Sequence, residues 1–335
     1  MQARASIWAE VPGLFALALP IVVGLAATTL LGVTDSLMLA PLGPVPLAAV
    51  GLTNAAAIIV YAALYGLLSV MSVRIGTAYG AGAARTIPAI LRNGLALGAV
   101  AGVGGALVMG AIWPLMPLFG QPAEVLEAMP AYWTAMSLLM IPFSILTVFK
   151  STFEAVGRPW VGTFFAFTAV VLNVPLNYAL IWGVGPFPML GLTGAGIATV
   201  TAESIALAAA WMYWQRAPSM RRLRLRRPLD TATIRATAVE GAPLGLMYVA
   251  ETGAVAVATL IIGTFGTLAL AGNQVAMAVG GVLYMVPLGM AGAVAIRVAQ
   301  ENGAGNIAAM RAVGWAGLGV ATLWLSTCEI GRAHV

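Results

Sequence analysis

Long apolar segments separated by short polar loops run through the chain. Each of the first eight is about twenty residues long or longer, the length that an α-helix needs to cross the hydrocarbon core of a bilayer. A ninth begins near residue 308 and is cut short. The pattern predicts an all-α polytopic membrane protein. The eight segments lie near residues 13–39, 47–72, 88–112, 128–149, 160–182, 190–214, 236–264 and 268–295.

The charged residues lie mostly in the loops and predict the topology. Six arginines fall between Arg216 and Arg227, and such a cluster marks a cytoplasmic loop. Counting spans from this loop places the other basic loops on the same side, Glu124 and Glu127 on the outer side, and the amino terminus in the cytoplasm. Composition agrees with a membrane protein, since 61% of the residues are hydrophobic and 8% are charged, against roughly a quarter charged in soluble domains. The net charge of +5 therefore reflects topology and not a nucleic-acid partner.

Several residues recur at a spacing of 223 positions. Pro20 is matched by Pro243, and Arg74 with the turn Gly80–Gly82 is matched by Arg297 with Gly303–Gly305. Because six spans separate equivalent points, the two copies have the same orientation and are related by an axis along the membrane normal. We therefore expect two six-helix repeats, twelve helices in all, of which about eight and a half are present. The expected division is an N-lobe (1–214), a cytoplasmic Arg-rich loop (215–235) and a partial C-lobe (236–327).

The end of the chain differs in character from the rest. Cys328 is the only cysteine, which excludes an internal disulfide, and His334 is the only histidine. The segment 329–335 can be back-translated to a widely used sequencing-library adapter. We therefore expect it to be the non-native tail of a truncated gene fragment, and we assign no chemistry to His334.

Three acids lie inside predicted spans. A charged side chain in hydrocarbon is costly unless it is protonated or faces a wet cavity, so such acids are by default functional candidates. Asp35 can exchange a proton, or it can be a solvated carboxylate near the interface. Glu251 is the stronger candidate, because no basic residue lies in the neighbouring turns, so that it is protonated or coordinates a cation such as Na+. Glu203 fits a functional role and a purely structural role equally well. Pro20 can act as a hinge or as a static kink.

Polar amides form a second group of candidates. Asn173 and Asn177 lie one helical turn apart on one face of the fifth span, and Asn273 and Gln274 lie early in the eighth. Amides of membrane helices often serve only to hold helices together. A role of these four residues and Glu203 in a substrate cavity is therefore open beside a packing role.

Other residues favour structure over chemistry. Gly94, Gly98 and Gly102 are spaced to let two helices approach closely. Lys150 and Glu154 read as a surface pair at a cytoplasmic helix end. No cluster of His, Cys or Asp suggests a hydrolase or protease, so we expect no enzyme activity.

Together these residues resemble the multidrug and toxic compound extrusion (MATE) family, in its NorM-type branch, over about residues 10–327. The likeness rests on short motifs in a fixed order: Pro20 with Asp35, Leu47-Ala48-Ala49-Val50, Gly80-Ala81-Gly82, Lys150-Ser151, Asn173-Val174-Pro175-Leu176-Asn177-Tyr178, Gly191-Leu192-Thr193-Gly194-Ala195, Glu251 and Gln274. It implies a secondary active multidrug efflux antiporter whose lobes swing between inward-open and outward-open states. Such a protein exports cationic or amphipathic compounds in exchange for Na+ or H+.

The resemblance also assigns roles to individual residues. Asp35 and Glu251 become the ion-coupling carboxylates of the two lobes, and Gln274 becomes a cavity residue near bound substrate. An acid expected in the tenth helix lies beyond this chain, so we expect incomplete cation coordination at Glu251 and no transport by the fragment alone.

The expected setting is the cell inner (plasma) membrane. There we expect a monomer that meets cationic drugs and the lipid bilayer, with no nucleic acid and no cofactor besides the coupling ion. The alternative is a related lipid-linked precursor flippase. That function needs a strongly cationic cavity, whereas the predicted spans contain acids and almost no arginine.

Overall fold

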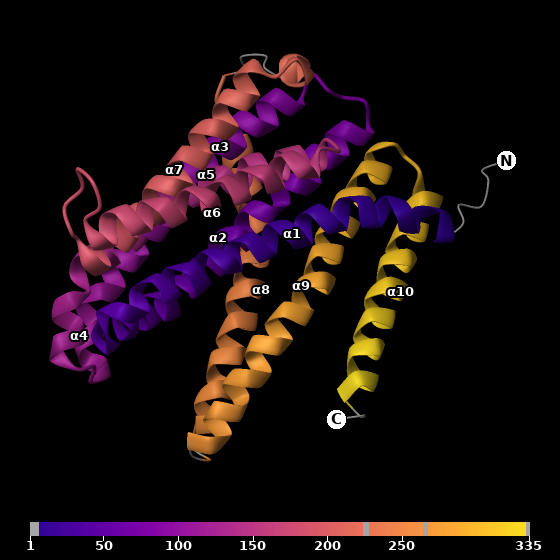
Figure 1. Ribbon diagram of the computed structural model, residues 1–335. Coiled ribbons are helices and arrows are strands. Elements are labelled where there is room, and N and C mark those ends of the chain that lie inside the picture. The colour runs from indigo at the N-terminus through magenta and orange to yellow at the C-terminus, as the bar shows by residue number, and fades with distance from the viewer. Residues whose placement is uncertain (1–6, 224–227, 264, 266, 333–335) are drawn as a thin grey trace.

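The structure is a computed structural model and describes residues 7–223, 228–263, 265 and 267–332 (Figure 1). Within this part of the chain no strand is assigned, and nine helices are long and apolar enough to cross a membrane. The predicted all-α, multi-pass fold class is confirmed. The nine helices are α1 (Ile7–Leu39), α2 (Pro44–Gly80), α3 (Ile87–Ile112), α5 (Pro130–Ala155), α6 (Pro159–Trp182), α7 (Gly191–Arg216), α8 (Thr231–Gly263), α9 (Thr267–Gly303) and α10 (Ile307–Arg332).

Short helical segments complete the path between the long helices. They are η1 (Ala40–Leu42), η2 (Trp113–Phe119), α4 (Ala123–Ala128) and η3 (Pro218–Leu223). The helix α1 continues through Pro20 without interruption, and the carbonyl of Pro20 accepts a hydrogen bond from the Thr163 hydroxyl of α6 at 2.6 Å. The two helices are thus joined at the proline.

The helices α1 to α7 pack into one bundle, which fills the left side of Figure 1 while the start of α1 reaches the right side. Its core is aromatic at one end, where Phe149 and Phe153 of α5 stack against each other, and at the other end Tyr132 and Trp133 of α5 are buried. The expected glycine contact is confirmed. A Cβ atom at Gly102 of α3 would lie 2.7 Å from the Cα atom of Ile141 on α5, so only glycine permits this distance.

The remaining helices pack on the bundle through only part of their length. The helix α8 packs on α2, α9 packs on α1 and α2, and α10 packs on α9 and α1. The helices α8 and α9 extend as a pair well beyond the bundle (Figure 1). Beyond Tyr248, whose ring contacts that of Tyr65 at 5.5 Å, the α8 side chains Val255, Val257 and Ile261 are exposed. The two parts of the molecule therefore meet near one end and diverge toward the other.

Contacts between α1–α2 and α8–α9 follow the repeat that the sequence predicts. A Cβ atom at Gly66 of α2 would lie 2.7 Å from the Cα atom of Gly245 on α8. The equivalent contact joins Gly289 of α9 to Val22 of α1, where the distance to the Val22 nitrogen would be 3.1 Å. Gly66 and Gly289 are 223 residues apart, as are Val22 and Gly245. Reciprocal contacts of this kind are typical of two units related by a two-fold axis.

The structure differs from the sequence-based expectations in three local respects. The ninth segment is not cut short, because α10 has 26 residues and its apolar stretch Ile307–Thr327 has 21. Lys150 and Glu154 are not a surface pair: both are partly buried, and no ion pair joins them among the described residues. His334 and the last part of the 329–335 segment lie outside the described residues.

The third difference concerns the loop before α8. The helix begins at Thr231 and not after residue 235, because Asp230 caps it. The Asp230 carboxylate accepts hydrogen bonds from the Ala232 N–H at 3.0 Å and from the Thr233 hydroxyl at 2.5 Å. An aspartate at this position satisfies helix N–H groups that would otherwise lack acceptors. These hydrogen bonds also lower the pKa of Asp230, with that from Thr233 the largest cause.

Candidate functional site

Asp35 lies at the centre of a buried polar network between α1, α6 and α7. One carboxylate oxygen, Oδ1, accepts a hydrogen bond from the Asn177 amide at 2.5 Å, and the other, Oδ2, lies 3.1 Å from the Thr199 hydroxyl, which is placed to donate to it. The same Asn177 amide donates to Asn173 Oδ1 at 2.9 Å, and the Asn173 amide donates to Thr199 at 3.1 Å. The structure thus brings three residues predicted from the sequence into direct contact.

The network is buried, and no basic side chain takes part in it among the described residues. Asp35 is 7% exposed, Thr199 is 4% exposed, and Asn173 and Asn177 are fully buried. Within the described part of the chain, no Lys or Arg lies within ion-pair distance of Asp35. Among the described residues, no group donates a hydrogen bond to Oδ1 of Asn177. A carboxylate held only by neutral donors in such a place gains from any cation or proton that neutralises it.

Thr199 is the member of this network that the sequence did not single out. It lies in the alanine-rich helix α7, and its hydroxyl can also donate to the carbonyl of Ala195 one turn earlier, at 2.9 Å. A single threonine in a membrane helix usually bonds to its own backbone in this way. Only the approach of α7 to α1 turns Thr199 into a partner of Asp35.

Glu203 lies one helical turn beyond Thr199 on α7 and is partly buried. It lines a small cavity of about 30 Å³ together with Lys150 and Thr147 of α5 and Thr28 of α1. This volume is about that of one water molecule. Glu203 therefore belongs to the same lobe as Asp35 but not to its hydrogen-bond network.

Glu251 lies apart from Asp35, on α8. Its side chain is exposed, and Oε1 accepts a hydrogen bond of 2.6 Å from the Tyr284 hydroxyl of α9. Tyr284 is 33 residues away and is not among the candidates predicted from the sequence. Asn273 does not join this pair, since its amide donates to Thr259 at 3.4 Å, and the side chain of Gln274 lies outside the described residues. The structure therefore supports a carboxylate–phenol pair at Glu251 and separates it from the Asn273 amide.

The oxygen atoms near Asp35 suit a hard cation better than a transition metal. Among the described residues, no group of three or more His, Cys, Asp or Glu side chains could hold a metal ion. The carboxylate of Asp35, the amide oxygens of Asn173 and Asn177 and the Thr199 hydroxyl are the oxygen ligands that hard cations prefer. They are equally able to surround a protonated carboxyl group.

Comparisons with known proteins agree in pointing to one family of membrane proteins. The family model described as MatE matches residues 20–179 and 243–326, two segments that fall in the two predicted repeats. A relative from Deinococcus radiodurans, described as "Probable multidrug resistance protein NorM", is 34% identical over 96% of this chain and 71% of its own length. Another from Pseudomonas putida with the same description is 30% identical over 92% of this chain and 68% of its own length.

A solved structure has the same fold over nearly the whole chain. A "eukaryotic MATE transporter AtDTX14" is similar with a TM-score of 0.85 at 19% identity, covering 98% of this chain and 74% of its own. This chain therefore spans about seven tenths of the length of the proteins that it resembles.

Proposed function

This chain belongs to the MatE family, and on that premise we propose that it is a secondary active multidrug exporter of cationic or amphipathic compounds. Export would be driven by exchange for Na+ or H+. The two relatives described as probable multidrug resistance proteins support export of several drugs. The observation that supports ion coupling is the buried Asp35 carboxylate, whose hydrogen-bond partners are all neutral.

The coupling follows from competition for a negative charge. Because Asp35 is buried, water screens its charge poorly, and the charge is balanced by a proton, by Na+ or by a cationic substrate. Binding of the ion then lowers the affinity for a cationic compound and favours its release. Export results when the ion and the compound have different affinities for the two orientations of the site, as any ligand-driven switch requires.

Glu251 would play the corresponding role in the other lobe. Its hydrogen bond to Tyr284 fixes one carboxylate oxygen and leaves the other for a cation. An aromatic ring beside a carboxylate can also contact a cation through its face. The proposed setting is a monomer in the cell inner membrane. The arginine-rich loop supports an amino terminus in the cytoplasm.

Drug efflux under separate ion gradients tests the proposal. The chain spans about seven tenths of the length of its relatives, so it is completed to their full length and produced in cells that lack other exporters. Ethidium or norfloxacin efflux is followed under an imposed Na+ gradient and, separately, an imposed H+ gradient. We expect Asp35→Asn and Glu251→Gln each to weaken the dependence of efflux on the coupling ion. Glu124→Gln is the matched control, because Glu124 is an exposed acid of the short helix α4. Ion-driven efflux that is unchanged in both amide variants would refute the proposal.

A further inference from the structure

Two arginines at equivalent positions of the repeat each reach across to the opposite half of the molecule. Arg74 of α2 donates from Nε and Nη2 to the two carboxylate oxygens of Glu240 on α8, at 2.8 and 2.6 Å. Arg297, which is 223 residues later on α9, donates from Nη2 to Glu10 of α1 at 3.4 Å. Each arginine of a second helix thus pairs with an acid on the first helix of the other lobe.

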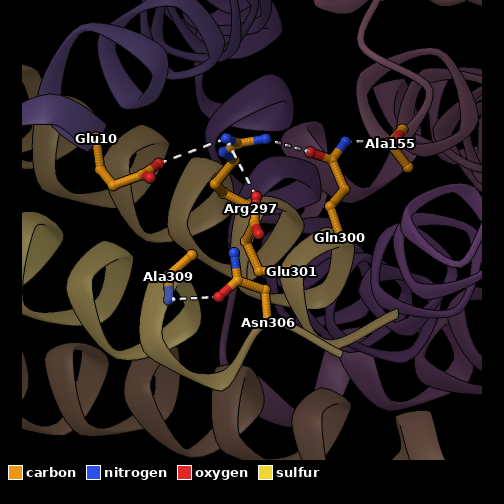
Figure 2. Close-up of polar contacts among 7 residues, drawn as sticks. All are labelled: Glu10, Ala155, Arg297, Gln300, Glu301, Asn306 and Ala309. Carbon is orange, nitrogen blue, oxygen red and sulfur yellow. Dashed lines mark hydrogen bonds and ion pairs between the residues drawn. The ribbon is translucent and has the colours of Figure 1, made fainter. Parts of the chain in front are cut away.

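The arginine Arg297 lies in a larger polar cluster at this end of the molecule (Figure 2). It also pairs with Glu301, one turn along its own helix, at 3.2 Å. The neighbouring Gln300 donates from Nε2 to the backbone carbonyl of Ala155, at the end of α5, at 2.9 Å. The cluster therefore connects α9 both to α1 and to the end of α5.

Close backbone contacts accompany the ion pairs and repeat in the same way. A Cβ atom at Gly80 would overlap the carbonyl oxygen of Gln300, and one at Gly303 would overlap the carbonyl oxygen of Thr77. Gly80 and Gly303 are equivalent in the repeat, as are Thr77 and Gln300. The ends of α2 and α9 thus touch through two reciprocal contacts, and neither glycine tolerates a side chain while the contact exists.

We propose that the Arg74–Glu240 and Arg297–Glu10 pairs form a latch that holds the arginine-bearing ends of the two lobes together. The latch closes the path on that side while the lobes diverge at the other end, and it breaks when the lobes exchange their orientation. This inference rests on the proposed export function only in assuming that the lobes move. We place the two ion pairs at the boundary between the moving lobes because each pair joins helices from different repeats. Both pairs also lie at one end of the molecule only.

The two halves of the latch differ in what they lose when it opens. Arg297 keeps Glu301 as a partner on its own helix. Arg74 has no ion pair other than that with Glu240 among the described residues. Loss of Glu240 is therefore the most direct perturbation, and because its side chain is 52% exposed, we expect a modest effect, about two- to five-fold in the ratio of closed to open molecules.

Distances between spin labels on the two glycine-containing turns measure this ratio. The labels are placed at Arg85→Cys and Ala304→Cys in a Cys328→Ser background, because Arg85 and Ala304 are exposed at the two turns. In the reconstituted protein we expect Glu240→Gln to raise the population of long distances about two- to five-fold. The reversed pair Arg74→Glu with Glu240→Arg should restore the original distribution, which a folding defect would not do.

A matched control is Arg311→Gln, which removes an exposed arginine that makes no ion pair within the described part of the chain. It should leave the distances unchanged. The latch is disproved when Glu240→Gln gives the distribution of the unmodified protein, or when the reversed pair does not restore it. The distances are recorded without drug or ion gradient, so the result of this test does not depend on whether Asp35 drives efflux. If efflux depends on Asp35 but Glu240→Gln leaves the distances unchanged, the latch is wrong and the proposed function stands.

Discussion

Replacing Thr199 with valine tests whether the Asp35 network carries a charge. The change keeps the shape of the side chain and removes the hydroxyl that lies 3.1 Å from both Asp35 Oδ2 and the Asn173 amide. Two buried polar groups then lose a partner. A buried group left without its hydrogen bond costs about 1–3 kcal/mol, and more when it is charged. Ordinary hydrogen bonds between membrane helices average only about 0.6 kcal/mol.

These two magnitudes separate the alternatives. When the network serves only to hold helices together, Thr199→Val should cost about 1 kcal/mol, because two ordinary bonds are lost. When Asp35 is a carboxylate that depends on its donors, the cost should reach about 2–6 kcal/mol. The control is Thr152→Val, because Thr152 is fully buried and its hydroxyl donates only to Val148 on its own helix, at 2.7 Å.

Thermal unfolding of the purified protein provides the assay. A loss of 1 kcal/mol corresponds to about 2–4 °C in Tm for a chain of a few hundred residues, so the charged network predicts a fall in Tm of about 4 °C or more. Saturating Na+ or protonation should reduce the difference between Thr199→Val and the unmodified protein, since a neutralised Asp35 needs its donor less. A fall no larger than that of Thr152→Val, independent of both ions, would refute the reasoning.

Three further perturbations follow from single contacts. Tyr284→Phe removes the hydrogen bond to Glu251 and should change the ion concentration for half-maximal efflux in the same direction as Glu251→Gln, but by less; an unchanged ion dependence contradicts the pairing. Gly102→Ala places a Cβ 2.7 Å from a backbone atom of α5 and should lower stability by about 1–3 kcal/mol, whereas Gly104→Ala, with nothing within 4 Å, should leave Tm unchanged. For Asp230, the lowered pKa means that its contribution to α8 is present above the unfolded value of about 4 and is lost as pH falls through the folded value. The protection factors for hydrogen exchange at the start of α8, which correct for the pH dependence of the intrinsic exchange rate, should therefore fall on acidification in the unmodified protein and not in Asp230→Asn.

The helices could be predicted from the sequence because the bilayer imposes one requirement on every span. Each must bury its backbone hydrogen bonds and expose apolar side chains over about twenty residues, and this leaves a continuous pattern in the chain. The helix-facing glycines of α3 and the shared face of Asn173 and Asn177 follow equally from the helical period. Residues that act within one helix are therefore visible in the sequence.

Residues that act between helices leave no such pattern. Thr199 and Tyr284 become partners of Asp35 and Glu251 only through the packing of α7 on α1 and of α9 beside α8. The ion pair of Arg74 with Glu240 spans 166 positions, and no periodicity connects them. The exposure of Glu251 likewise depends on which helices cover α8, a property of the assembled fold and not of its own helix.

The repeat separates structural residues from chemical ones. Positions that hold the two lobes together are duplicated, as Gly66 with Gly289 and Arg74 with Arg297 show. The candidate coupling acids are not. The position equivalent to Asp35 is occupied by Ala258, and the position equivalent to Glu251 by Thr28.

A two-fold scaffold of this kind can move symmetrically while binding its ions asymmetrically. Asp35 is buried among neutral donors, whereas Glu251 is exposed and held by one phenol. Because the two environments differ, the lobes should bind the coupling ion with different affinities. Asp35→Asn and Glu251→Gln should therefore alter the ion dependence of efflux differently, and identical changes in the two variants would show that both acids belong to one site.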